Sequence, residues 1–286
     1  MKKTVLVTAL SAALSASAPT LAADPASDAP APAATSPAPL TGNLSLASSY
    51  RFRGIDQTFG RPALQGGFDY AHASGFYLGN WNSNVSSGAG YPDGNLEMDF
   101  YGGYKTTFGD FGVDVGALYY YYPGSSVSGL GQGHSGTVNN KEIYLGSTWK
   151  FLSLKYFYAI DDYFSLRGVD SAGMNTDQRT RGTQYLDFAL SYDLGDGWGI
   201  NGHVGHLRLR NVRNGDYSDW KIGVSKDISG WLLAASYVDS NARGDCGGSA
   251  FAPYCFANSL SESGATGGKH KDAGRGIAVV SISRNF

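Results

Sequence analysis

The sequence predicts an all-β fold, a transmembrane antiparallel up-and-down β-barrel of about 12 strands. Three observations predict it. Segments of alternating apolar and polar residues recur along the chain, each about as long as a strand that crosses a bilayer. Short and long connections alternate between these segments. The composition combines 40 glycines and 19 tyrosines with 16% charged residues, which favours strands and turns over helices.

The N-terminal residues predict export from the cytoplasm. Two lysines at positions 2 and 3 precede an Ala-rich apolar stretch, and small residues follow near position 22. This is the pattern of a cleaved Sec-type signal peptide over residues 1–23, with an apolar part shorter than the roughly 20 residues of a spanning helix. Residues 24–40 are rich in proline and alanine and predict a disordered spacer. The barrel is then expected over residues 41–286.

Period-two alternation defines the predicted strands. In the stretch "FGVDVGALYYYY", for example, Val113 and Val115 share one face while Asp114 lies on the other. Each such segment has about the 9–11 residues that a tilted transmembrane strand needs. The predicted strands cover residues 42–53, 62–71, 75–84, 95–106, 111–122, 140–150, 152–161, 183–194, 198–209, 217–227, 231–239 and 276–286.

The connections predict the orientation of the barrel. Those after the even-numbered strands are tight, as in "TFGD" and "ISG". Those after the third, fifth, seventh and eleventh strands are long, and those after the first and ninth are intermediate. Barrels of the Gram-negative outer membrane have short periplasmic turns and long extracellular loops. We therefore expect this localisation, with both ends of the barrel chain on the periplasmic side.

Closure of the barrel follows from backbone hydrogen bonding. In lipid, every N–H and C=O group must be paired within the protein, so an open sheet edge is excluded. We expect the strand over residues 42–53 to pair with the strand over residues 276–286. The terminal Phe286 resembles the end signal of outer-membrane proteins that the barrel-assembly machinery reads.

A soluble β-sandwich or a lipocalin-like barrel is the alternative, because alternation alone does not tell the inner face from the outer one. Strand length, loop asymmetry and aromatic residues at strand ends favour the membrane. The aromatic residues expected at the two interfaces are Tyr50, Tyr70, Tyr104, Tyr121, Trp149, Tyr158, Trp198, Trp220 and Trp231.

The segment over residues 45–105 resembles a known family. It contains "SSYRFRGI", "PALQGGFDYAH", "GFYLGNWNSNV" and "LEMDFYGGY". These stretches are similar to those of the TorF family of proteobacterial porin-like proteins, also called the Gcw_chp family. The resemblance implies an outer-membrane barrel and implies no substrate. The matching residues are Tyr50, Arg53, Gly54, Pro62, Gln65, Gly66, Gly67, Asp69, Tyr70, Gly75, Tyr77, Gly79, Trp81, Ser83, Asn84, Val85, Glu97, Asp99, Tyr101 and Tyr104.

If the apolar faces meet lipid, the charged residues line the interior. We expect Arg51 and Arg53 to point the same way from one strand, beside Asp69 on the next strand. Such charges either lock the barrel as ion pairs or line a small pore with little charge selectivity. The expected lining residues are Arg51, Arg53, Asp69, Glu97, Asp99, Lys105, Asp114, Glu142, Lys150, Lys155, Asp161, Asp187, Asp219 and Lys221.

The remaining chemistry is limited. Cys246 and Cys255 lie nine positions apart in an exported chain, which predicts a disulfide. The scattered histidines predict no metal site, and we expect no cofactor and no catalytic residue. A net charge of −2 argues against a nucleic-acid partner. The expected function is a porin-like channel for small polar solutes, embedded in outer-membrane lipid. The alternative is a non-conducting barrel that acts through its loops as an adhesin or an envelope structural protein.

Overall fold

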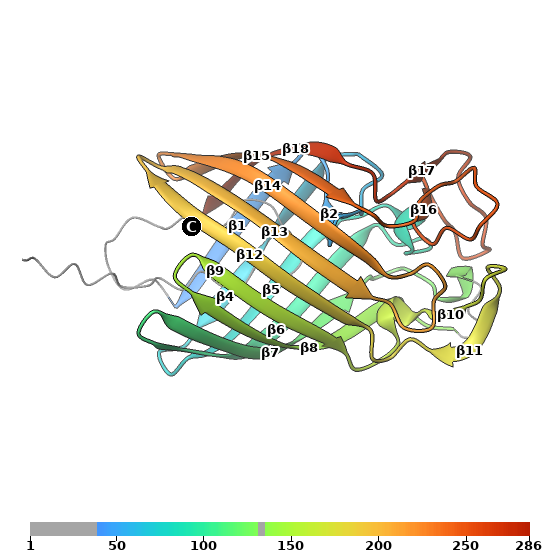
Figure 1. Ribbon diagram of the computed structural model, residues 1–286, viewed down its shortest axis with the longest axis horizontal. Helices are drawn as coiled ribbons and strands as arrows, with labels where there is room; N and C mark the ends of the chain where they lie inside the picture. Colours follow the sequence, from blue (N-terminus) through green and yellow to red (C-terminus); the bar gives the residue numbers. More distant parts are fainter. Residues whose placement is uncertain (1–38, 131–134) are drawn as a thin grey trace, which may run out of the picture.

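The computed structural model describes residues 39–130 and 135–286, and within them twelve strands close into one antiparallel barrel (Figure 1). Neighbouring strands around the barrel follow the order β1-β18-β15-β14-β13-β12-β9-β8-β7-β6-β5-β4, and β4 pairs with β1. The all-β barrel prediction is therefore confirmed. The predicted signal peptide and all but the last residues of the predicted spacer lie outside the described residues. Leu40, assigned to that spacer, already belongs to β1.

The barrel strands are β1 (Leu40–Ala47), β4 (Ala63–Ala71), β5 (Phe76–Asn84), β6 (Leu96–Phe108), β7 (Phe111–Tyr121), β8 (Asn139–Trp149), β9 (Leu152–Ala159), β12 (Gln184–Gly195), β13 (Trp198–Arg208), β14 (Tyr217–Ile228), β15 (Trp231–Ser240) and β18 (Ile277–Asn285). Short elements lie in the connections: β2 (Arg51–Phe52), β3 (Ile55–Asp56), β10 (Arg167–Val169), β11 (Asn175–Arg179), β16 (Cys255–Ala257), β17 (His270–Asp272) and the 3-10 helices η1 (Ser87–Ala89), η2 (Ser128–Leu130) and η3 (Tyr163–Ser165). Within the described part of the chain, no helix is long and apolar enough to cross a membrane.

The first and last barrel strands pair as expected. Asn43 of β1 lies opposite Asn285 of β18, and Ala47 lies opposite Ser281. The backbone N–H of Gly42 donates to the carbonyl of Phe286, so pairing continues to the last residue. The first strand is shorter than predicted, however, because it ends at Ala47 and the chain then turns into the barrel.

The tight turns all lie at one end of the barrel and the long connections at the other (Figure 1). Two of these turns are two-residue hairpins in which both residues have positive φ: Asp196 and Gly197 at 52° and 75°, and Ser229 and Gly230 at 56° and 84°. This conformation matches the right-handed twist of paired strands, and glycine adopts it without steric cost. Short polar residues followed by glycine therefore set the register at the predicted periplasmic end.

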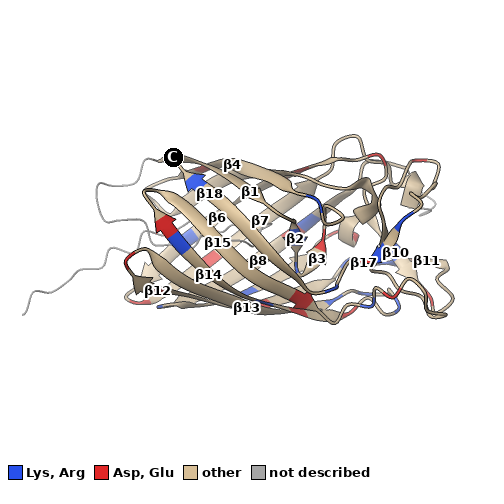
Figure 2. Cartoon of the chain, turned by 90° about the horizontal axis from the view of Figure 1, so that it is seen from above, with Lys and Arg blue, Asp and Glu red and all other residues tan. Residues whose placement is uncertain are grey.

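The outer surface of the barrel is apolar. Side chains such as Val115, Leu145 and Ile222 point outward and are 50%, 57% and 70% exposed. On the same strands, Glu142 and Asp219 point inward and are at most 1% exposed. In Figure 2, long stretches of the barrel strands are tan and so contain no charged residue. A barrel in lipid requires this arrangement, with apolar side chains on the outside and charged side chains on the inside. A soluble barrel would have the opposite arrangement.

Most of the predicted interfacial aromatics are exposed near strand ends, including Tyr70, Trp149 and Trp198. Tyr50 is an exception, because its side chain is fully buried inside the barrel. Its assignment to the interfacial belt was wrong, since the chain has already left β1 at this position.

Glycine and tyrosine pair across the inner face. Tyr101 lies opposite Gly79, and Tyr144 lies opposite Gly116. Each ring covers its glycine so closely that a Cβ at the glycine would collide with the ring. Many interior glycines therefore serve to seat a tyrosine ring flat against the barrel wall.

A charge on the outer wall should destabilise the barrel according to its depth. Leu145 lies midway along β8, and Leu194, also exposed on the outer face, lies near the turn end of β12. We expect Leu145→Arg to lower the unfolding free energy by about 2–4 kcal/mol, and the matched control Leu194→Arg by about 0–1 kcal/mol. Urea unfolding in lipid vesicles, followed by tryptophan fluorescence, measures both values. Equal costs at the two positions would contradict the membrane placement.

Candidate functional site

The first connection between barrel strands folds into the barrel interior. Residues 48–58, here called the lumen segment, contain the β2–β3 hairpin, which both views place between the strands (Figures 1 and 2). Every residue of the segment after its first is buried. The ring of Tyr50 packs edge-on against Trp81 of β5, and the ring of Phe52 packs against Tyr120 of β7. The segment therefore fills the half of the lumen nearest the long connections.

The hairpin turns tightly at Arg53 and Gly54. Both residues have positive φ, 48° and 78°, as a two-residue hairpin turn requires. Gly54 also approaches β14 closely, because a Cβ at this position would stand 2.6 Å from the Cβ of Asp219. Glycine is required here both for backbone conformation and for space.

Arg53 forms a buried ion pair with the opposite wall. Its Nη1 and Nη2 donate to Oε1 and Oε2 of Glu142 on β8 at 3.0 and 2.8 Å. Nη1 also donates to the hydroxyl of Tyr163 at 3.1 Å. The guanidinium lies over the rings of Tyr185 and Phe157, with centroid distances of 4.3 and 4.9 Å. This bidentate, ring-enclosed geometry fixes the hairpin within the lumen.

Arg51 ties the lumen segment to the last long connection. Its Nη1 donates to the carbonyl of Ala273 at 2.9 Å, and its Nη2 lies 3.8 Å from Asp56. Asp56 also forms an ion pair with Lys271. The expected clasp of Arg51 and Arg53 with Asp69 is therefore wrong. The two arginines lie on a hairpin inside the barrel rather than on the first strand, and apart from Asp56 the partners named here, Ala273 and Glu142, are distant in sequence.

Loop residues complete the anchoring of the segment. Tyr91, from the connection between β5 and β6, donates its hydroxyl to Oε1 of Gln57 at 2.5 Å. Burial raises the pKa of Tyr91 well above its ordinary value, and the nearby Glu97 carboxylate raises it further. At neutral pH the hydroxyl is therefore protonated, as its hydrogen bond to Gln57 requires.

The half of the lumen nearest the tight turns has a network of half-buried charges. Asp114 of β7 accepts from the hydroxyl of Tyr77 at 2.6 Å and from Nζ of Lys155 at 3.1 Å. Asp69 accepts from the hydroxyl of Tyr101 at 2.6 Å. These contacts place Asp69, Asp114 and Lys155 on the inner wall, as the alternation indicates. Lys105 joins them, with Nζ 5.4 Å from the centre of the Tyr77 ring.

A second network lies on β12, β13 and β14. The ring of His203 lies between two carboxylates, with Nδ1 3.0 Å from Asp187 and Nε2 3.3 Å from Asp219. The hydroxyl of Tyr185 donates to Asp219 at 3.0 Å. Lys221, also predicted to line the interior, is buried on the same strand as Asp219. Among the described residues, no group of three or more His, Cys, Asp and Glu side chains could hold a metal ion.

Two buried carboxylates have few partners. Glu97 and Asp99 point inward from β6 and are each 1% exposed. Oε1 of Glu97 accepts from the hydroxyl of Tyr122 at 2.9 Å, whereas Oε2 has no hydrogen-bond partner among the described residues. Neither carboxylate oxygen of Asp99 has such a partner within that part of the chain. Asn140 lies opposite Tyr120 on the neighbouring strand, and Tyr120 lies opposite Asp99. The buried side-chain amide of Asn140 also has no hydrogen-bond partner among the described residues. The lumen therefore contains two buried carboxyl groups whose oxygens have few or no hydrogen-bond donors among the described side chains.

Two predicted lining residues lie outside the interior. Lys150 is exposed in the tight turn after β8, with Nζ 5.2 Å from the centre of the Trp149 ring. Asp161 follows β9 at the opposite end and forms ion pairs with Lys141 and Arg179 at 3.0 and 2.7 Å. Burial alone would raise the pKa of Asp161, but the hydrogen bond from Lys141 and these cationic neighbours lower it. Both residues end a strand, where alternation no longer determines which way a side chain points.

The sequence reasoning missed the tyrosines that line the lumen. Tyr77, Tyr101 and Tyr185 donate to the interior carboxylates that the charge pattern identified. The alternation along each strand contains a signal that identifies them. A tyrosine that lies an even number of positions from an Asp or Glu on the same strand points to the inner wall.

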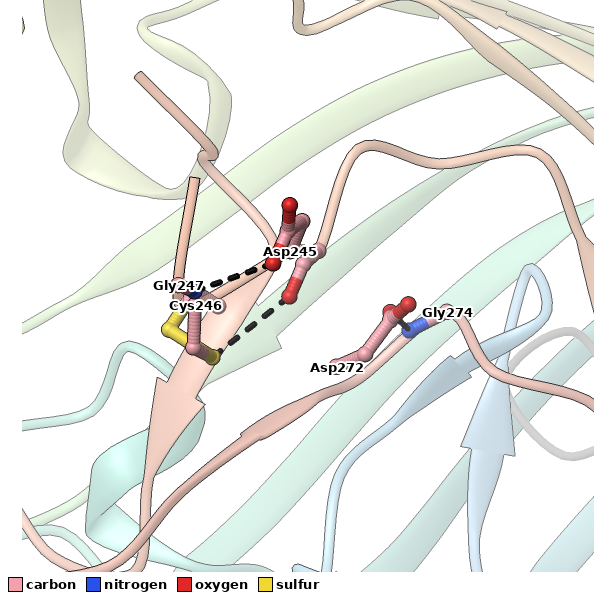
Figure 3. Close-up of a disulfide and its surroundings, with 7 residues drawn as sticks. Asp245, Cys246, Gly247, Asp272 and Gly274 are labelled. Atoms are coloured by element: carbon pink, nitrogen blue, oxygen red, sulfur yellow. Dashed lines mark hydrogen bonds between the residues drawn. A yellow bond between two sulfur atoms is a disulfide. The ribbon is translucent and has the colours of Figure 1, made fainter. Parts of the chain in front are cut away.

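The predicted disulfide is present in the last long connection. Cys246 and Cys255 are bonded, and Cys255 pairs with Asp272 across β16 and β17 (Figure 3). Nearby, Asp272 accepts from the backbone N–H of Gly274 at 2.9 Å. The bridge therefore braces the connection that carries Lys271 and Ala273, the contacts of the lumen segment.

Removing the disulfide should loosen this connection without opening the barrel. We expect Cys246→Ser combined with Cys255→Ser to destabilise the connection over residues 241–276 by about 2–3 kcal/mol, because the closed loop is short. Limited proteolysis should cut within this range faster than in the native protein. The thermal transition of the barrel should stay unchanged, and a large fall in that transition would contradict the local role.

Taken together, the apolar outer wall, the closed strand order and the charged interior define a transmembrane β-barrel with a segment inside its lumen. The chain belongs to the family described as "Bacterial protein of unknown function (Gcw_chp)", whose model matches residues 31–259. No curated protein matches the sequence.

Solved porin structures are similar to the chain at low sequence identity. A NanC porin structure has a TM-score of 0.49 and 10% identity, covering 86% of this chain and 98% of that one. A KdgM porin, solved in complex with disordered oligogalacturonate, has a TM-score of 0.45 and 10% identity, with coverage of 86% and 97%. Outer-membrane expressed OmpT of Vibrio cholerae has a TM-score of 0.39 and 9% identity, with coverage of 86% and 96%.

Proposed function

We propose that this protein is a porin-like channel of the Gram-negative outer membrane, in the TorF branch of its family, that passes small polar solutes. One observation carries the proposal: a closed barrel with an apolar outer wall encloses charged side chains on several strands. Such an interior solvates polar solutes, whereas the outer wall fits lipid. The same observation gives no support to a catalytic role.

The route to the membrane belongs to the same proposal. Residues 1–23 would direct export and be cleaved. The barrel-assembly machinery would then recognise the closing strand β18 and its terminal Phe286. The exposure of the Phe286 ring on the outer wall supports this role, because the ring is 70% exposed and available to a partner.

The lumen segment determines how a solute would pass. Tyr50 and Arg53 block the half of the lumen nearest the long connections, being fully or nearly fully buried. Passage therefore requires the hairpin to move away from Glu142. A non-conducting barrel that acts through its loops is the second candidate, and the filling of the lumen by this hairpin is the observation that favours it.

The charged residues around the lumen segment favour the passage of cations. Arg53 is paired with Glu142, whereas Glu97 and Asp99 have carboxylate oxygens without partners among the described residues. When the hairpin moves away and water reaches these two carboxyl groups, they ionise, and Coulomb attraction of cations within a narrow lumen is stronger than in bulk water. We therefore propose that the open channel prefers cationic solutes, whereas the sequence alone predicts little charge selectivity.

Planar bilayer recordings test the proposal. The refolded barrel should show discrete openings, with a reversal potential in a KCl gradient that indicates preference for K⁺. Glu97→Gln combined with Asp99→Asn should abolish this preference, whereas Asp161→Asn, outside the lumen, should leave it unchanged. Silence from well-folded protein would reject the channel in favour of the non-conducting barrel. Openings with unaltered selectivity in the double variant would reject the role of these two carboxylates.

A further inference from the structure

An arginine-rich groove lies on the outside of the barrel, at the end with the long connections. It has a volume of about 410 Å³ and lies where β9, β11 and the segment after β13 meet. Figure 1 shows the β10–β11 hairpin extending beyond the barrel at this end. The groove is lined by Tyr158, Gln178, Arg179, Arg181, Arg210 and Asn211.

The groove is strongly basic. The side chains of Arg181 and Arg210 are exposed and form no ion pair or hydrogen bond with a described residue. Arg179 is held by Asp161 and Asp162 at 2.7 and 2.6 Å, which orients its guanidinium at the edge of the groove. These carboxylates do not line the groove itself, so the charged side chains in its described lining are all cationic.

The local backbone positions the two remaining arginines. Gly182 has a φ of 89°, and Nη1 of Arg210 lies 3.0 Å from where its Cβ would be. The hydroxyl of Tyr158 lies 3.3 Å from the same point. The turn at Gly182 therefore lets Arg210 lie across it on the side of the Tyr158 hydroxyl, and Arg181 lines the same groove. Two arginine forks at one site suit a phosphate group, because each offers paired donors in a fixed plane.

An apolar surface begins directly below the groove. In register, Tyr158 of β9 lies opposite Gln184 of β12, which lies opposite Arg208, a further outward arginine at the end of β13. One step toward the membrane centre on the same face, Leu186 and Tyr156 are 46% and 39% exposed, and the exposed His206 of β13 completes the row. The next outward row is fully apolar, formed by Leu154, Phe188 and Val204, which are 44%, 44% and 51% exposed.

We propose that this groove binds the phosphorylated headgroup of a lipid in the outer leaflet, with the acyl chains of that lipid lying along β9, β12 and β13. The basic groove and the apolar rows are continuous on one face, which matches a molecule with anionic and hydrocarbon parts. A soluble phosphate compound would use the groove alone. The proposal depends on the membrane placement of the barrel and is independent of conduction.

Binding of diphosphoryl lipid A to the full-length protein in detergent tests this proposal, with native mass spectrometry as the readout. Arg181→Ala combined with Arg210→Ala should weaken binding by at least about tenfold, as loss of two charge-assisted contacts implies. The control is Arg61→Ala combined with Arg243→Ala, which removes two exposed arginines elsewhere, and it should bind as the native protein does. Unchanged thermal transitions establish that each variant is folded.

Two further probes distinguish the sources of binding. Lipid A from which both phosphates have been removed should bind at least about tenfold more weakly to the native protein. Inorganic phosphate should compete only at far higher concentration than the lipid. Equal binding of the dephosphorylated lipid, or equal binding by the double variant, would overturn the proposal. Binding of inorganic phosphate as tight as that of the lipid would also overturn it, in favour of a site for soluble anions.

Discussion

Arg53→Met is expected to lower the unfolding free energy by about 3–5 kcal/mol. The substitution keeps much of the side-chain volume but leaves Glu142 charged, buried and without its bidentate partner. It also removes the cation from the rings of Tyr185 and Phe157. Equilibrium unfolding of the refolded barrel in urea measures the loss.

Two controls separate the ion pair from loss of contact area. Lys141→Met breaks the half-exposed pair with Asp161, and it should cost about 0–1 kcal/mol. Arg53→Met combined with Glu142→Met should recover much of the stability lost in the single variant, because no buried charge then remains unpaired. A double variant as unstable as the sum of the two single ones would show that the ion pair itself is unimportant.

Removal of the lumen segment is expected to raise single-channel conductance several-fold. Ala47 of β1 and Ala63 of β4 are direct partners, so deletion of residues 50–60 leaves a four-residue connection between paired strands. The barrel strands and their hydrogen bonds remain intact, whereas Tyr50 and Arg53 no longer fill the lumen. Planar bilayer recordings before and after deletion measure the change.

Deletion of residues 167–179 is the matched control. This range contains the β10–β11 hairpin, and its ends meet because the Thr180 hydroxyl donates to the Leu166 carbonyl at 2.7 Å. The deletion is similar in length but lies beyond the barrel, so conductance should be unchanged. If the two deletions have equal effects, or if loss of the lumen segment leaves the barrel closed, that segment is not the constriction.

The barrel strands could be predicted from sequence because lipid and lumen impose opposite polarity on alternate residues. The lumen segment could not be separated from the first strand by the same signal. Ser49, Arg51 and Arg53 continue the inward phase of Ser45 and Ala47. A strand that continues straight and a chain that turns inward both place these side chains inside. The alternation of polar and apolar residues therefore does not distinguish the turn from a continuing strand.

The same limit applies to the candidate site. Alternation along the strands predicts inward charges such as Asp114 and Glu142, but it does not predict which residues they contact. Arg53 and Glu142 are 89 positions apart, and Arg51 contacts a carbonyl 222 positions away. Such pairings depend on which strands face each other across the lumen, and the pattern within one strand contains no information about that.

The hydrogen bond from Arg51 to Ala273 also has a consequence for assembly. The first connection between barrel strands is held in part by Ala273, which lies just before β18, the last barrel strand in the chain. A chain inserted only as far as β15 therefore lacks this contact of its interior hairpin, although Arg53 can already pair with Glu142 on β8. We therefore expect the hairpin to gain its full set of contacts only when β1 and β18 pair, so that closure of the wall and final placement of the hairpin coincide.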